Sequence, residues 1–250
     1  MELEQRIELI ADLVQRYKGG AQLEQVKREA KAVFGHMRPD EIGAVERGLT
    51  ARRVNIEDLH EVHRLHLDNL QQELATIRAA VEPWHPIRTM IDEHDEILRT
   101  LDALEGLNSK VQQAADSDKA LLAELRTLAE NLLAAEHHHK REEDVVFPEL
   151  TKGGIGMTVK AMSDEHDEMR AMKHALRSLA DRAENMEFSD FQRELDNLAQ
   201  YIVYNLGDHI YRENYILYPA ALRMVSDKAL WTDLKRRCDE IGYCHFKPVH

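Results

Sequence analysis

The residues of this chain that could do chemistry are histidines and glutamates recurring at regular spacing. The segment Asp-Glu-His-Asp-Glu surrounds His94, and the same five residues surround His166, 72 positions later. A second pattern, a histidine followed four residues later by a glutamate, also occurs twice, 71 positions apart: His138 with Glu142, and His209 with Glu213. A spacing of four places both side chains of a pair on one helical face. The sequence therefore repeats one unit, a single histidine followed by a His-x-x-x-Glu pair.

The chemistry that suits these residues is metal binding. Burying four imidazoles and two carboxylates without partners costs several kcal/mol per charged group, and a cation removes this cost by making them ligands. Histidine and carboxylate ligands without cysteine favour iron, manganese or zinc. Two glutamates can bridge two metal ions and leave coordination positions open for O2, NO, peroxide or azide.

Four long amphipathic stretches must position these residues: 86–106, 118–148, 155–184 and 188–222. Turn residues separate them at Asn108, at the glycines of 153–156 and at 187–189. Long helices joined by short turns pack as antiparallel neighbours, so the sequence predicts an all-α, up-down four-helix bundle. In such a bundle His94 lies nine residues from His85, at the start of its helix. His138 lies ten residues from Pro148, at the end of the next, so the two meet at nearly the same level.

The segment Pro83-Trp84-His85-Pro86 interrupts the helical pattern and predicts a domain boundary. We therefore expect three parts: a small helical N-terminal domain at 1–82, the bundle at 83–225, and a C-terminal helix and tail at 226–250. In the first part, helices are predicted over residues 2–18 and 23–34, from Pro39, and from Asn55 to about residue 80.

Composition excludes several functional classes. The 250 residues carry a net charge of −13, which disfavours nucleic acids and anionic membranes as partners. No apolar stretch is long enough for a transmembrane helix, and the N-terminus lacks the features of a secretory signal, so we expect a cytoplasmic protein. The two cysteines, Cys238 and Cys244, form neither a disulfide framework nor a metal-binding motif and are expected to be free thiols.

The four motifs, EHDEI, HHHKREEDVVFP, EHDEM and HIYRENYILYP, resemble those of the hemerythrin-like (HHE cation-binding) family over residues 84–222. The resemblance implies a four-helix bundle holding a non-haem centre of two iron ions with an oxo or hydroxo bridge. It also implies the ligands, with the two glutamates bridging: His94, His138, Glu142, His166, His209 and Glu213. The segment PDEIGAVERGLTARRVNIEDLHEVH is similar to a helical domain of unassigned function that precedes such bundles in some bacterial proteins.

Two departures from family patterns bear on function. Position 170 is Arg, where oxygen-carrying hemerythrins have a further histidine, so a coordination position is left open. The pattern is closer to iron-centre repair proteins, but their paired N-terminal cysteines are absent.

The leading hypothesis is a di-iron protein that binds, senses or reduces O2, NO or peroxide. The alternatives are iron donation to damaged iron–sulfur centres, a regulatory module that contacts a protein partner through its N-terminal helices, and a zinc-filled structural bundle. Whether the protein is an enzyme is left open.

Five further residues have a second interpretation. His139 and Glu143 form another His-x-x-x-Glu pair one residue later, so Glu143 is an alternative to Glu142. His85 is expected to cap a helix and is an alternative ligand. His63, with His60 and His66, is expected to lie on a surface or an interface, with metal binding as the alternative. The tyrosines of the fourth helix are expected to pack in the core, and Tyr204 is a candidate to line the site.

Overall fold

The computed structural model describes most of the chain: residues 3–22 and 74–244, with positions 25–26, 29–30, 33, 48–49, 51–52 and 54. The chain divides into two compact units, residues 1–79 and 80–250. The described residues form helices and turns and include no β-strand, which confirms the predicted all-α class. None of the described helices has the length and apolar character needed to cross a membrane.

In the first unit, helix α1 spans Leu3–Lys18. Its apolar side chains at Ile7, Ile10 and Leu13 are buried, as expected for a helix with one apolar face. The helix ends before Gly20, whose φ of 82° is a backbone conformation that glycine adopts at little cost. The other helices predicted for this unit lie largely outside the described residues, and His60, His63 and His66 lie entirely outside them.

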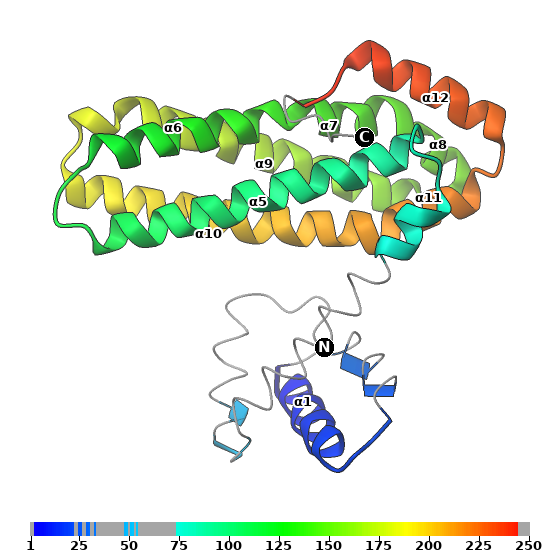
Figure 1. Ribbon diagram of the computed structural model, residues 1–250, viewed down its shortest axis with the longest axis horizontal. Coiled ribbons are helices and arrows are strands. Elements are labelled where there is room, and N and C mark those ends of the chain that lie inside the picture. The colour runs from blue at the N-terminus through cyan, green and yellow to red at the C-terminus, as the bar shows by residue number, and fades with distance from the viewer. Residues whose placement is uncertain are drawn as a thin grey trace. The chain divides into compact units, whose positions relative to one another are not determined.

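The second unit is a bundle of four long helical arms running up and down (Figure 1). The first and third arms each pack against the second and the fourth. The first arm is α5 (Pro86–Gln113). The second comprises α6 (Lys119–Ala134), α7 (Glu136–Arg141), the π-helical turn η1 (Glu142–Val146) and α8 (Phe147–Leu150). After a second π-helical turn, η2 (Thr151–Ile155), the third arm is α9 (Gly156–Arg182), followed by the 3-10 turn η3 (Ala183–Asn185). The fourth comprises α10 (Phe188–Arg212), the π-helical turn η4 (Glu213–Leu217) and α11 (Tyr218–Met224).

The first arm is longer than the sequence pattern predicted. A turn at Asn108 was expected, but α5 continues to Gln113. The expectation was wrong because Asn108 is buried at a helix contact, where its amide donates a hydrogen bond of 2.8 Å to Asp196 Oδ1 in α10. The chain turns instead between Ala114 and Asp118, whose side chain caps α6 by accepting a hydrogen bond from the Ala120 amide.

An apolar core fills most of the bundle's length. It contains buried side chains from all four arms, in the ranges 97–111, 122–135, 169–183 and 191–210. The six histidines and glutamates singled out by the sequence lie at or beyond one end of this core, toward the start of α5. This apolar packing fixes the positions of the four arms next to these six polar residues.

A further helix, α12 (Lys228–Ile241), packs against α5, α7 and η1 (Figure 1). It buries Trp231 and Leu234, and both cysteines are free and buried. Burial raises the pKa of Cys238 to about 11 and that of Cys244 to about 12, so neither is a reactive thiolate at neutral pH. The division of the chain into functional domains at residues 82 and 225 stays a prediction.

Candidate metal centre

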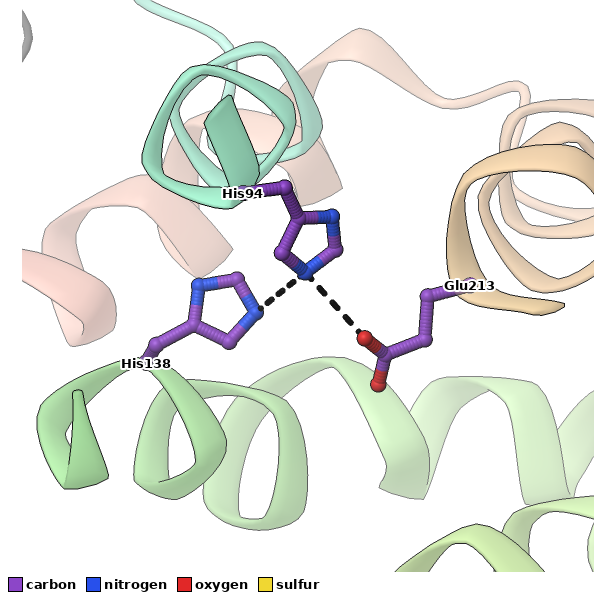
Figure 2. Close-up of side chains that lie close together, drawn as sticks. All are labelled: His94, His138 and Glu213. Atoms are coloured by element: carbon purple, nitrogen blue, oxygen red, sulfur yellow. Dashed lines mark hydrogen bonds and ion pairs between the residues drawn. The ribbon is translucent and has the colours of Figure 1, made fainter. Parts of the chain in front are cut away.

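The structure brings together six side chains from all four arms. All six are 0% exposed: His94, His138, Glu142, His166, His209 and Glu213. The single histidines lie within α5 and α9, and the paired ones lie in α7 and at the end of α10. Figure 2 shows three of these side chains converging, with the Nε2 atom of His94 facing both His138 and Glu213.

Each glutamate of the cluster is the first residue of a π-helical turn. Glu142 begins η1 and Glu213 begins η4, and the amides of Phe147 and Tyr218 donate to the carbonyls five residues earlier. A proline follows each turn, at positions 148 and 219. Because proline has no N–H to donate, it interrupts the α-helical hydrogen bonds at these points. The wider π turn is a local feature often found at functional sites.

The outer nitrogen of each imidazole is held by an oxygen. The Nδ1 contacts are 2.7–2.9 Å long: His94 to Asn214 Oδ1, His138 to Glu93 Oε2, His166 to Glu143 Oε1, and His209 to Glu165 Oε2. Because a carboxylate or an amide oxygen only accepts, each Nδ1 carries the proton and donates. The tautomer is thereby set, and each Nε2 presents a lone pair toward the interior, as metal-binding histidines do.

These inward atoms come close enough to be ligands of a shared cation. The Nε2 atoms of His94 and His138 are 3.0 Å apart, and those of His166 and His209 are 2.8 Å apart. Glu213 reaches both pairs, at 3.1 Å from His94 and 2.8 Å from His209. Three buried carboxylate oxygens have no hydrogen-bond partner: Glu142 Oε2, Glu213 Oε1 and Glu213 Oε2. Facing lone pairs and unpartnered carboxylates are costly by themselves, and both fit a site that holds two metal ions.

A known family is recognised at these residues. A family model for the hemerythrin HHE cation-binding domain matches residues 85–221, more than half of the 250 residues. The chain belongs to the hemerythrin HHE cation-binding family. The match contains all six side chains of the centre, and it confirms the resemblance and the hemerythrin-like bundle. The comparison with curated proteins gave no match.

Within the hemerythrin domain, the two alternative glutamates take different places. Glu142 is fully buried, and its Oε2 lies 3.5 Å from His138 Nε2 and 3.6 Å from His166 Nε2, between the two histidine pairs. Glu143 instead contacts the outer nitrogen of His166, and its side chain is 24% exposed. The geometry therefore places Glu142 among the inward donors and Glu143 behind an imidazole.

The two inward carboxylates have opposite electrostatic surroundings. Burial, and then the nearby charge of Glu213, raise the pKa of Glu142 well above its ordinary value. Burial acts to raise the pKa of Glu213 as well, but His209, His166 and His94 outweigh it and hold that pKa well below the ordinary value. The charges of the two inward carboxylates therefore oppose each other. A bound cation would stabilise both charges together.

Charged residues surround the hemerythrin centre in pairs. Each carboxylate behind an imidazole has an arginine partner: Glu93 with Arg141, Glu143 with Arg170, and Glu165 with Arg212. A buried lysine, Lys173, donates a 2.6 Å hydrogen bond to Glu136. These partners neutralise the outer carboxylates.

The structure describes three other candidates from the sequence, of which His139 contacts the centre. His85 is buried, caps α5 by accepting from the Ile87 amide, and packs against Trp231 with ring centroids 4.2 Å apart and the rings tilted by 49°. His139 is buried and stacks on His166 at 4.0 Å. Tyr204 is half-buried in α10, five residues before His209. His63 lies outside the described residues.

Sequence reasoning assigned no site role to Tyr218, which lies inside the centre. It is 0% exposed, and its hydroxyl donates a 2.7 Å hydrogen bond to Glu142 Oε1. Burial, and then the charge of Glu142, raise the pKa of Tyr218 well above its ordinary value, which keeps it a donor. The available signal was its position, five residues after Glu213, matching Phe147 after Glu142. The supporting glutamates Glu93 and Glu165 also had a signal, because each directly precedes a repeated histidine.

Proposed function

We propose that this hemerythrin-family protein holds two iron ions between its six inward donors and binds a small oxidant there, O2, NO or peroxide. The observation that carries the proposal is the arrangement of two histidine pairs around shared carboxylates. His94 with His138 and His166 with His209 each form a group with Glu213 in which all donor atoms lie within 4.8 Å of one another. Mixed histidine and carboxylate donors suit iron, and the family is named for cation binding.

The residues of the chain contribute the environment. Complete burial of the six donors keeps bulk water away from them. The Nδ1 hydrogen bonds hold the four imidazoles in one tautomer and orientation, with the lone pairs inward. Tyr218 places a hydroxyl within the centre, 2.7 Å from Glu142 Oε1. When bound, iron would supply electrons and an open coordination position for the oxidant.

The test is metal content per chain, measured together with the visible spectrum, after expression with added iron. We expect about two irons per chain in the unaltered protein and far fewer in the double variant His138→Ala/His209→Ala. The matched control is His174→Ala, which removes an exposed histidine of α9 and should keep both irons. A colourless protein that retains zinc through iron reconstitution, or one that binds no metal, would contradict the proposal.

A second candidate function is signalling to a partner protein in the cytoplasm. The observation that favours it is the separate unit at residues 1–79, which has its own apolar core including Ile10, Leu13 and Leu49. A change of oxidation state at the iron centre would then alter this unit. Limited proteolysis of the oxidised and reduced forms tests this, and identical cleavage within residues 1–79 would argue against signalling.

A further inference from the structure

One position of the repeat differs between the two halves of the centre. Phe147 and Tyr218 are 71 residues apart, each five residues after an inward glutamate and directly before a proline. Each ring lies nearly parallel to one of the single histidines. Phe147 is 5.7 Å from His166 at 19°, and Tyr218 is 5.5 Å from His94 at 9°. Two equivalent places are thus filled by equivalent rings, and one of the rings carries an oxygen.

The oxygen of Tyr218 lies among the inward donor atoms. It is 2.7 Å from Glu142 Oε1, 3.3 Å from His138 Nε2 and 3.5 Å from His94 Nε2. Metal bonds of about 2.1 Å at right angles place neighbouring ligand atoms about 3.0 Å apart. The separations of His94 from His138 and from Glu213 are 3.0 and 3.1 Å. The phenol oxygen therefore has the spacing of a ligand to the same metal.

Packing alone does not account for the hydroxyl. Phe147 fills the equivalent place beside His166 without a polar atom. The hydroxyl has one proton, which it gives to Glu142, so nothing it donates satisfies the two Nε2 lone pairs that it also faces. A metal shared by the phenol oxygen and both imidazoles would bring these three electron-rich atoms together favourably.

We propose that Tyr218 is a further protein ligand, binding through its phenol oxygen the metal held by His94 and His138. The oxidant would then bind at the position of His166 and His209, where Phe147 offers no donor. Coordination would break the phenol O–H bond, form a metal–oxygen bond and release one proton to solvent, with no change in the oxidation state of the metal. The inference rests on the proposed two-iron centre and adds to it the assignment of the open position.

The experiment uses the iron-loaded full chain. A phenolate bound to ferric iron gives a visible charge-transfer band, and resonance Raman excitation of that band enhances ring vibrations that shift when the tyrosines are ring-deuterated. We expect this signature in the unaltered protein and its loss in Tyr218→Phe, with iron content unchanged. Tyr211→Phe is the matched control, because it removes a half-buried hydroxyl of α10 and should leave the band intact.

The exchange variant Phe147→Tyr/Tyr218→Phe should restore the band by placing a phenol beside His166. Titration with azide then measures the number of open coordination positions. We expect the azide bound per chain to rise about twofold in Tyr218→Phe. Two irons without a tyrosine-sensitive band, or a band that persists in Tyr218→Phe, would overturn this inference and leave the two-iron centre standing. A chain that binds no iron would instead overturn the proposed function.

Discussion

The two halves of the centre share a ligand pattern but differ in their surroundings. In the half of His94 and His138, the supporting pair Glu93 and Arg141 is almost completely buried, with side chains 0% and 1% exposed. In the half of His166 and His209, the equivalent pair Glu165 and Arg212 is 34% and 26% exposed. The sequence repeat therefore produces matching donors, while access to solvent separates the halves.

The C-terminal segment causes this difference. Beyond α12, the carbonyl of Gly242 accepts a 2.5 Å hydrogen bond from Arg141, and the Tyr243 ring lies 4.7 Å from that guanidinium. The Cys244 amide donates to Glu93. Within the described residues, this segment thus covers the supporting pair of the half of His94 and His138, because α12 packs on α5, α7 and η1. A duplicated site becomes asymmetric through a neighbour that lies outside the duplication.

The largest effect should come from removing the atom group that both halves share. Glu213→Gln replaces a carboxylate that reaches both histidine pairs with a weakly binding amide. We expect metal content to fall from about two to well below one per chain, because neither half keeps its full donor set. Metal analysis with circular dichroism measures this, and Glu168→Gln, an exposed change in α9, is the control. Retention of both metals would show that Glu213 is not shared.

The packing of α12 over the half of His94 and His138 can be weakened without changing any of the six inward side chains. Leu234→Ala removes a fully buried side chain of α12 and should lower the free energy of unfolding by about 2–5 kcal/mol. It should also speed iron removal by a chelator from the His94 and His138 half alone. Urea unfolding and the two phases of iron release measure these effects, with exposed Thr232→Ala as the control. Equal acceleration of both phases would contradict an asymmetric cover.

The metal affinity of the half of His166 and His209 can be lowered by changing the carboxylate that holds His209. Glu165→Gln removes the charge behind His209, and loss of such a support lowers metal affinity by about 10–100-fold. Because Arg212 is partly exposed, water can solvate it after the change, so we expect the fold to keep its stability. Competition with a chelator of known affinity measures the weaker half. An unchanged affinity would mean that the negative charge behind His209 contributes nothing.

The smallest expected effect is a loss of stability at acidic pH. Burial lowers the pKa of His85 to about 4, from an ordinary value of 6.5. Between these values the unfolded chain binds a proton that the folded chain does not, so stability falls as pH decreases from about 6.5 toward 4. From pH 7 to pH 5.5 this costs about 1 kcal/mol. His85→Asn keeps a helix cap and should remove that part of the pH dependence, as measured by urea unfolding at both pH values. Parallel pH profiles for both proteins would contradict the assignment.

Much of the fold could be predicted because local patterns specify it. Apolar side chains at helical spacing predicted the four arms, and short turns predicted their antiparallel packing. The predicted end of the first helix failed, because Asn108 is a residue typical of turns that here pairs with Asp196 on another arm. A local pattern contains no information about a partner 88 residues away.

The sequence by itself determined the candidate donors, because helical spacing and the 71- and 72-residue repeats place His94, His166 and the two His-x-x-x-Glu pairs at one level. Only the tertiary structure decided which glutamate faces inward, because Glu142 and Glu143 differ by one helical step and the π turn sets the register. It also decided which half is covered, and it placed the Tyr218 oxygen beside His94 and His138. These features depend on contacts between segments far apart in the chain, and such contacts exist only once the arms have packed.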